Sequence, residues 1–310
     1  MELKYIIFTL VVILGVPVGV FLTRISIRFM HFTFVSMVVS LCESDMLEVM
    51  YISRPFYRTI TRGIGFSLAE ICALILLFGM ILRRDEYKIR WIPPMFLVNA
   101  FYILIIVISW LMVKGDVLVP PKYFQLGLWG PLTTDYFEVT LYPLFELSKI
   151  FRGLLIFWVV VSYLSVKSNF RFLLLSFLIL VAYVGGTALY QRYFQGMHRV
   201  GSTMSHPNLL ATFMVMCFSI LFGYGLKEKD LKIKGICFGS SALCILTIVM
   251  TLSRGGMATV VIVCCMLLFF LYFRNRSMSN NIFAVIGVFC ALVIFVKSMD
   301  TLMSRFSAKA

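Results

Sequence analysis

Long apolar runs separated by short polar breaks cover almost the whole chain. Each run extends over roughly 17–20 residues, the length that an α-helix needs to cross a hydrocarbon core of about 30 Å. The short alternating segments typical of a membrane β-barrel are not visible in the sequence. The pattern predicts ten membrane-spanning helices, at about 5–22, 25–41, 67–82, 95–113, 147–165, 171–189, 208–226, 236–252, 256–273 and 281–297.

The polar breaks between these runs are of two alternating kinds. Every second break is short and basic: TRISIR, RRDEYKIR, VKSNFR, KEKDLKIK and RNR. Because Lys and Arg are enriched in cytoplasmic loops, these five breaks are predicted to be cytoplasmic. The other breaks then face outward, and they comprise the loops 42–66, 114–146 and 190–207, the SRGG turn at 253–256 and the tail after 297.

Composition agrees with this topology. Hydrophobic residues make up 61% of the chain and charged residues 14%, whereas a soluble domain is about half apolar and about a quarter charged. The net charge of +14 would suggest nucleic acid in a soluble protein, but here the basic residues flank the spans, so no nucleic-acid partner is expected. The eight cysteines have no metal-binding spacing. The sequence predicts a single all-α, polytopic integral membrane domain over 1–310, without a metal or cofactor.

Arginines also occur on the predicted outer side, where topology does not require them. Arg254 lies between Ser253 and two glycines in an otherwise apolar run. An arginine at this position is costly unless it snorkels, pairs or lines a wet cavity. The glycines leave backbone N–H groups accessible to an oxyanion. The segment is therefore either a helical hairpin with a snorkelling arginine or part of an anion site.

The stretch HRVGSTMSHPNLLATF gathers further polar residues between two apolar runs. Pro207 predicts that a helix begins near Asn208, and its N-terminus would then point outward with free N–H groups and a positive dipole. Arg199, this helix start and Arg254 would together form an anion site. His206 either caps the helix or takes part in chemistry.

A third polar cluster, YISRPFYRTITRGIGFSLAEI, precedes the third predicted span. Arg54, Arg58 and Arg62 are spaced by four residues, which places them on one face if the segment is helical. Glu70 then enters the span, where an acidic residue is a functional candidate. The alternatives are an interfacial helix on anionic lipid and a simple pairing of Glu70 with Arg62.

The order of these motifs resembles the O-antigen ligase/polymerase family of bacterial inner-membrane glycosyltransferases. RVGSTMSHPNLLA and, one span later, TLSRGG carry the resemblance, within about residues 191–260. The resemblance implies a GT-C-like helical fold, a glycan donor on undecaprenyl pyrophosphate, and transfer on the periplasmic side to another glycan or to lipid A core. Membrane lipids surround such a protein. The pyrophosphate would be bound by Arg199 and Arg254, with Arg62, Asn208 and Ser253 as further candidates.

Transfer to an acceptor hydroxyl requires a general base. Members of this family carry a catalytic histidine in a large outer loop beyond the spans seen here, whereas this sequence reaches Ala310 with no histidine after His206. Either the chain is truncated, or the base is His206, His198, Glu70 or Glu146, or the protein is not catalytically complete. Two other classes stay open: a transporter or flippase for a lipid-linked or anionic substrate, and a non-catalytic scaffold of a polysaccharide complex.

Overall fold

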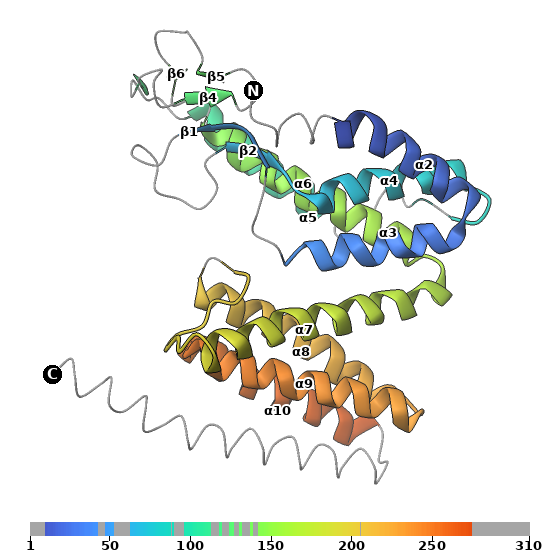
Figure 1. Cartoon of the computed structure of the whole chain (residues 1–310), viewed down its shortest axis with the longest axis vertical. Helices are drawn as coiled ribbons and strands as arrows, with labels where there is room; N and C mark the ends of the chain where they lie inside the picture. The colour runs from blue at the N-terminus through green and yellow to red at the C-terminus, as the bar shows by residue number, and fades with distance from the viewer. Residues whose placement is uncertain are drawn as a thin grey trace, which may run out of the picture. The chain divides into compact units, whose positions relative to one another are not determined.

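The structure of the chain is a computed structural model, and helices make up most of it (Figure 1). It describes residues 10–42, 47–52, 63–87, 89, 96–112, 118–119, 124–126, 130–131, 137–138, 142–204 and 206–274.

A helix lies at each of the first nine predicted spans, whereas the tenth, 281–297, lies outside the described residues. The helices are α2 (Val16–Ile25, preceded by the π-helical turn Val11–Gly15), α3 (Ile27–Ser40), α4 (Leu68–Leu82), α5 (Phe96–Met112), α6 (Tyr142–Tyr163), α7 (Phe170–Tyr193), α8 (Pro207–Lys227), α9 (Leu231–Thr251) and α10 (Arg254–Arg274).

Three of the described helices are long and apolar enough to cross a membrane. They are Lys167–Tyr193 with 27 residues, and Pro207–Lys227 and Leu231–Thr251 with 21 residues each. Other described apolar helices, such as Ile27–Ser40 and Leu68–Leu82, are shorter. The helical class is confirmed and membrane association is supported, whereas the number of ten spans stays a prediction.

Polar side chains fix where several helices begin. Ser26 accepts a hydrogen bond from the Phe29 N–H at the start of α3 (3.4 Å). Asp230 accepts one from the Lys232 N–H at the start of α9 (2.9 Å). Such caps satisfy N–H groups that have no partner within the helix. The breaks TRISIR and KEKDLKIK therefore each end one helix and start the next.

The chain divides into two compact units, Met1–Leu173 and Leu174–Ala310. In unit 1, α4 packs against α2, α3 and α6. Contact with α2 depends on Gly19, because a Cβ there would lie 2.7 Å from Ile75 Cδ1. Small residues of this kind let membrane helices approach closely.

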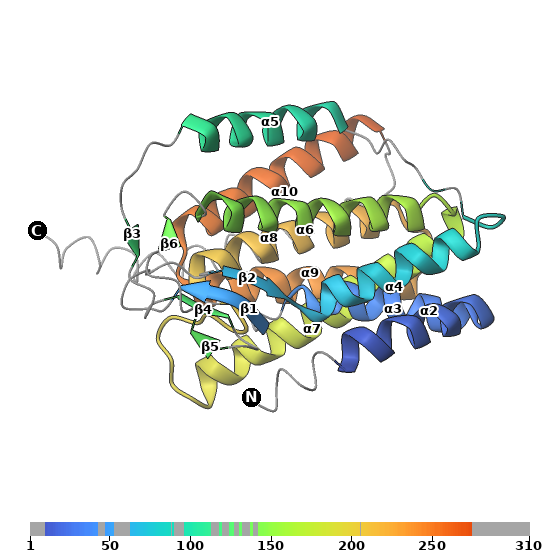
Figure 2. The ribbon, with the colours of Figure 1, turned by 90° about the horizontal axis from the view of Figure 1, so that it is seen from above.

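Short strands join two of the predicted outer loops of unit 1. β1 (Leu47–Ile52) pairs antiparallel with β2 (Gly63–Phe66), and it also pairs with β4 (Phe124–Leu126), which pairs in turn with β5 (Gly130–Pro131). β3 (Leu118–Val119) pairs with β6 (Phe137–Glu138). Figure 2 shows β1 and β2 at the end of unit 1 where α4 begins. The described strands β1 and β4 of these two loops therefore lie on the same side of unit 1, as the alternation of breaks predicts.

The basic turns of unit 1 also contact one another, through side-chain hydrogen bonds. Arg83 Nη2 donates to the carbonyl oxygen of Arg24 (2.8 Å), which connects the first two basic breaks. Asn169 Nδ2 donates to the Tyr87 hydroxyl (3.3 Å), which connects the second and third. Burial raises the pKa of the Tyr87 hydroxyl. These contacts place three of the predicted cytoplasmic breaks together.

In unit 2, α8, α9 and α10 pack against one another. α8 packs along α9, and α10 contacts both (Figure 1). The turns that connect these helices are short, so α8 and α10 run in the same direction and α9 runs opposite to them. The N-terminal ends of α8 and α10 consequently lie at the same end of unit 2.

Candidate functional site

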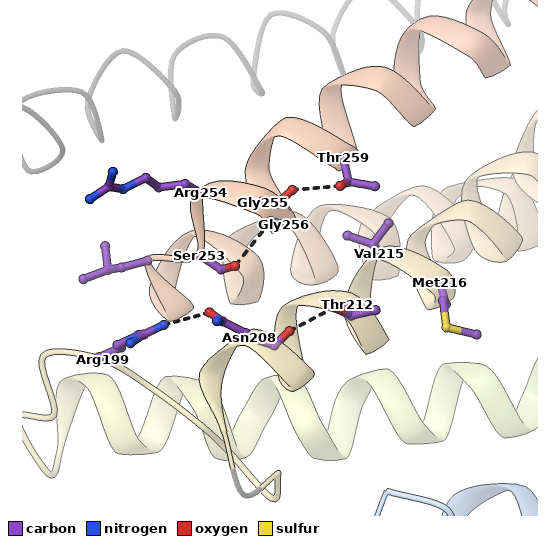
Figure 3. A pocket seen from close by; sticks show the side chains of 11 residues that line it. Arg199, Asn208, Thr212, Val215, Met216, Ser253, Arg254, Gly255, Gly256 and Thr259 are labelled. Atoms are coloured by element: carbon purple, nitrogen blue, oxygen red, sulfur yellow. Dashed lines mark hydrogen bonds between the residues drawn. The ribbon is translucent and has the colours of Figure 1, made fainter. Parts of the chain in front are cut away.

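A cavity of about 760 Å³ lies in unit 2 at the N-terminal ends of α8 and α10 (Figure 3). Its lining consists of Arg199, Asn208, Thr212, Val215, Met216, Leu252, Ser253, Arg254, Gly255, Gly256 and Thr259. Four of the five residues predicted to bind pyrophosphate are therefore brought to one cavity. The fifth, Arg62, lies outside the described residues.

Arg199 is held at the mouth of the cavity by oxygen atoms that carry no net charge. Its Nη2 donates to Asn208 Oδ1 at 2.7 Å (Figure 3), and its Nε donates to the Thr251 carbonyl at 3.2 Å. The neighbouring Val200 N–H donates to the Met250 carbonyl at 3.3 Å. The loop before α8 is thus fastened to the end of α9, and these partners of the Arg199 guanidinium are neutral.

The start of α10 forms a second wall. Leu252 has a φ of +54°, a left-handed conformation that ends α9 abruptly. Ser253 Oγ then accepts a hydrogen bond from the Gly256 N–H at 3.3 Å, which caps α10. Arg254, the first residue of α10, is exposed. Among the described residues, none accepts a hydrogen bond from the backbone N–H of Gly255.

Close packing holds α10 against α8 at this point. A Cβ on Gly256 would lie 2.7 Å from the Cβ of Ala211 and 3.3 Å from Ile248 Cγ2. Only a residue without a side chain fits such a separation. A Cβ on Gly255 would meet no atom within 4 Å. The two adjacent glycines thus differ: Gly256 allows the helices to approach, and Gly255 faces the cavity.

The start of α8 is capped by a histidine. His206 Nδ1 accepts a hydrogen bond from the Asn208 N–H at 3.1 Å. Because this contact uses the Nδ1 lone pair, the neutral ring carries its proton on Nε2. His206 is exposed and is not among the described residues that line the cavity. The capping role left open by the sequence is present in the structure, and the catalytic role of His206 stays a prediction.

The loop between α7 and α8 is fixed by side chains of α7. Gln191 exchanges two hydrogen bonds with the backbone of Ser202, at 2.8 and 3.1 Å. Arg192 Nη1 donates to the carbonyl oxygens of Met197 and His198, at 3.1 and 2.5 Å. Arg192 therefore has a structural role in fixing this loop, and it is not among the described residues that line the cavity, whereas Arg199 both fixes the loop and lines the cavity.

Glu70 has a structural environment in unit 1. Its Oε2 accepts a hydrogen bond from the Ser67 N–H at 2.5 Å, and the Ser67 hydroxyl donates to the same oxygen. Its Oε1 lies 3.7 Å from Arg152 Nη1. Arg152 is a cation found beside Glu70 in the described part of the chain. Arg62, which the sequence offers as an alternative partner of Glu70, lies outside the described residues. The carboxylate serves as a helix-capping group and as half of a buried ion pair, and its catalytic role stays a prediction.

The electrostatic character of the cavity follows from its lining. Two guanidinium groups and the N-terminal ends of two helices face it, and each helix end carries a partial positive charge of about half a unit. Of the described residues that line it, none is Asp or Glu. The arrangement suits an anion, because guanidinium and backbone N–H groups are the usual ligands of phosphate oxygens.

Thr212 and Thr259 are lining residues that the sequence reasoning missed. Each follows a polar or glycine position of the cavity by four residues, Thr212 after Asn208 and Thr259 after Gly255. Residues four apart lie on the same helix face. This spacing is the signal that would have identified them.

Among the described residues, no group of three His, Cys, Asp or Glu side chains is arranged to hold a metal ion. Comparisons with protein-family models, with curated proteins and with solved structures gave no match. The helical fold and the cationic cavity are therefore the basis for assigning a function.

Proposed function

We propose that the cavity of unit 2 binds the phosphate groups of a membrane-borne substrate. The observation that carries this proposal is the convergence of Arg199, Arg254 and the starts of α8 and α10 on one cavity with no acidic residue among its described lining. Such groups stabilise negative charge through charge-assisted hydrogen bonds and through the positive ends of the helix dipoles.

We propose further that the chain is a glycosyltransferase on the periplasmic side of the bacterial inner membrane. Its donor is a glycan on undecaprenyl pyrophosphate, and its acceptor is another glycan or lipid A core. The bond between the sugar C1 and the phosphate oxygen breaks, and the acceptor oxygen bonds to C1 while its proton passes to a base. The leaving pyrophosphate gains negative charge, which the guanidinium groups of Arg199 and Arg254 stabilise through paired hydrogen bonds. This role accounts for arginine, rather than lysine, at both positions.

One observation favours a second candidate, a transporter or flippase for a lipid-linked anion. Among the described residues that line the cavity there is no His, Asp or Glu, and the Nδ1 lone pair of nearby His206 is used by the helix cap. A site without a base binds an anion but does not deprotonate an acceptor.

The test is genetic complementation with Arg199→Ala and Arg254→Ala in a strain that lacks the gene. Each variant should abolish the surface glycan ladder while the protein level in the membrane stays normal. Arg84→Ala is the matched control, because Arg84 is an exposed arginine of a predicted cytoplasmic turn in unit 1. A normal ladder in both cavity variants would contradict the proposal. Uptake of the lipid-linked donor by proteoliposomes, without glycan transfer, would favour the transporter.

A further inference from the structure

Two threonines lie one helical turn beyond the cationic mouth of the cavity, on facing helices. Thr212 belongs to α8 and Thr259 to α10, and both are exposed side chains that line the cavity (Figure 3). One turn of helix corresponds to about 5.4 Å along its axis. A substrate that binds phosphate at the mouth therefore places its next group near these hydroxyls.

The hydroxyl protons of both threonines are already used. Thr212 Oγ1 donates to the Asn208 carbonyl at 3.0 Å, and Thr259 Oγ1 donates to the Gly255 carbonyl at 2.7 Å (Figure 3). A hydroxyl has a single proton and two lone pairs. With the proton directed at the backbone, each oxygen presents only acceptor lone pairs to a ligand.

The two levels of the cavity consequently select opposite groups. At the mouth, guanidinium groups and helix N-termini attract phosphate oxygens. At the level of Thr212 and Thr259, acceptor oxygens repel phosphate and attract O–H or N–H donors. Beyond them the lining becomes apolar with Val215 and Met216.

We infer that Thr212 and Thr259 form a subsite for hydroxyl groups of the sugar attached to the phosphate, and that they determine specificity for the glycosyl part of the donor. This inference rests on the proposed function, since it assigns the neutral portion of the same phosphate-bearing substrate. It adds a requirement that the arginines do not impose: the ligand must carry hydrogen-bond donors about one helical turn from its phosphate.

The alternative is that Thr212 and Thr259 contact a hydrocarbon chain rather than a sugar. A threonine whose hydroxyl bonds to its own helix can face lipid without an unsatisfied group. Thr187 in α7 illustrates this case: its Oγ1 donates to the Tyr183 carbonyl at 2.9 Å, the residue is half-buried, and it is not among the described lining residues of the cavity. It has the same local geometry outside the cavity and is therefore the matched control.

The experiment measures calorimetric binding of two probes to the detergent-solubilised full chain: citronellyl diphosphate, and citronellyl diphosphate carrying one glucose. The wild-type protein should bind the sugar-bearing probe more tightly. Thr212→Val and Thr259→Val keep the side-chain shape and should each weaken that probe about fivefold, the ordinary net contribution of one hydrogen bond. The double variant should bind both probes equally. Binding of citronellyl diphosphate alone should not change, Thr→Ser at either position should retain the preference, and Thr187→Val should match the wild type.

Three results would overturn the inference, and they show whether the subsite alone or the proposed function is wrong. If the wild type binds both probes with equal affinity, or if the double valine variant keeps the preference for the sugar, the subsite is wrong while the phosphate site stands. If the wild type binds neither probe, the proposed function is wrong and the subsite falls with it.

Discussion

Unit 1 and unit 2 each place an arginine beside the first turn of a helix, but they differ in what lies next to its charge. In unit 1, Arg152 lies 3.7 Å from the Glu70 carboxylate in α4, and the two side chains are 12% and 5% exposed. In unit 2, Arg199 is held by the amide oxygen of Asn208 and the carbonyl of Thr251. The first charge is neutralised within the chain, whereas the second is only positioned.

This difference separates a structural arginine from a binding arginine. A buried pair needs both partners, because removing one leaves an uncompensated charge. A guanidinium held by neutral oxygens keeps its charge for a ligand or for solvent. We therefore expect substitutions in unit 1 to affect stability and substitutions in the cavity of unit 2 to affect binding.

The largest expected effect is that of Glu70→Gln on stability. Glutamine can preserve the capping contact with Ser67, so the substitution removes the carboxylate that lies beside Arg152. We expect a loss of about 3 kcal/mol in the free energy of unfolding, which is typical for a broken buried pair. Urea unfolding in mild detergent measures this loss.

Glu86→Gln is the control for this change. Glu86 pairs with Arg83 at 3.1 Å but is 54% exposed, and exposed pairs contribute less than about 1 kcal/mol. Equal effects of the two substitutions would contradict the assignment of Glu70 and Arg152 as a stabilising buried pair.

Arg199→Ala should weaken ligand binding strongly and affect stability little, which is the opposite of Glu70→Gln. We expect the affinity for inorganic pyrophosphate to fall roughly 10- to 100-fold, because charge-assisted hydrogen bonds contribute about 1.5–3 kcal/mol each. The free energy of unfolding should change less than in Glu70→Gln, since the partners of Arg199 are neutral and the side chain is exposed. Calorimetry and urea unfolding on the same preparation give both quantities. The contrary result is an Arg199→Ala variant that is strongly destabilised but whose folded fraction binds pyrophosphate normally. Arg199 would then be a structural arginine like Arg152, and the distinction between the two units would be wrong.

The packing of α10 on α8 gives an intermediate effect. Gly256→Ala forces the helix starts apart, because the new Cβ would lie 2.7 Å from the Cβ of Ala211. We expect a loss of about 2 kcal/mol in stability, typical of overpacking, together with weaker pyrophosphate binding. Gly239→Ala in α9, where a Cβ meets nothing within 4 Å, should be neutral or slightly stabilising, since alanine favours helix. A thermal-shift assay measures the stability of both variants. Equal melting temperatures of Gly256→Ala and Gly239→Ala would contradict the close packing of α10 on α8.

The smallest expected effect is that of Glu228→Gln on the pH dependence of stability. The Glu228 carboxylate is exposed and accepts hydrogen bonds from neutral donors. A hydrogen bond from the Tyr224 hydroxyl, followed by the N–H groups of Asp230 and Lys229, lowers the pKa of Glu228. A lowered pKa stabilises the fold above the ordinary pKa of the group, and that contribution is lost as pH falls through the folded-state value. Between about pH 5 and pH 3 the unfolding midpoint of Glu228→Gln should therefore decrease slightly less than that of the wild type. If the unfolding midpoints of the wild type and of Glu228→Gln decrease equally as pH falls, the exposed Glu228 carboxylate contributes nothing to the pH dependence of stability.

Much of the helical pattern and part of the candidate site follow from the sequence. The apolar runs predict the positions of the first nine helices, and Pro207 predicts the start of α8. The spacing of RVGSTMSHPNLLA and TLSRGG brings Arg199, Asn208, Ser253 and Arg254 to one cavity. These features are local, since they depend on helix length, helix caps and chain direction.

The remaining features depend on contacts between distant segments. Nothing in the local sequence pairs Glu70 in α4 with Arg152 in α6, because the two residues are far apart in the chain. The strands in the outer loops also escape a search for alternating residues, because they are two to six residues long and are held by partners far along the chain. The role of Gly256 requires knowledge of Ala211 on another helix.

The pairing of β1 with β4 determines when the four-stranded sheet can form during translation. Tyr51 pairs with Gln125, and both α4 and α5 lie between them in the chain. β1 is therefore translated well before its partner, and the four-stranded sheet β2-β1-β4-β5 cannot close until both helices have left the ribosome. During that interval an unpaired strand edge is open to wrong partners. Closure of the sheet is thus a late step in the biogenesis of unit 1, and a stalled nascent chain that ends before β4 should carry β1 without this partner.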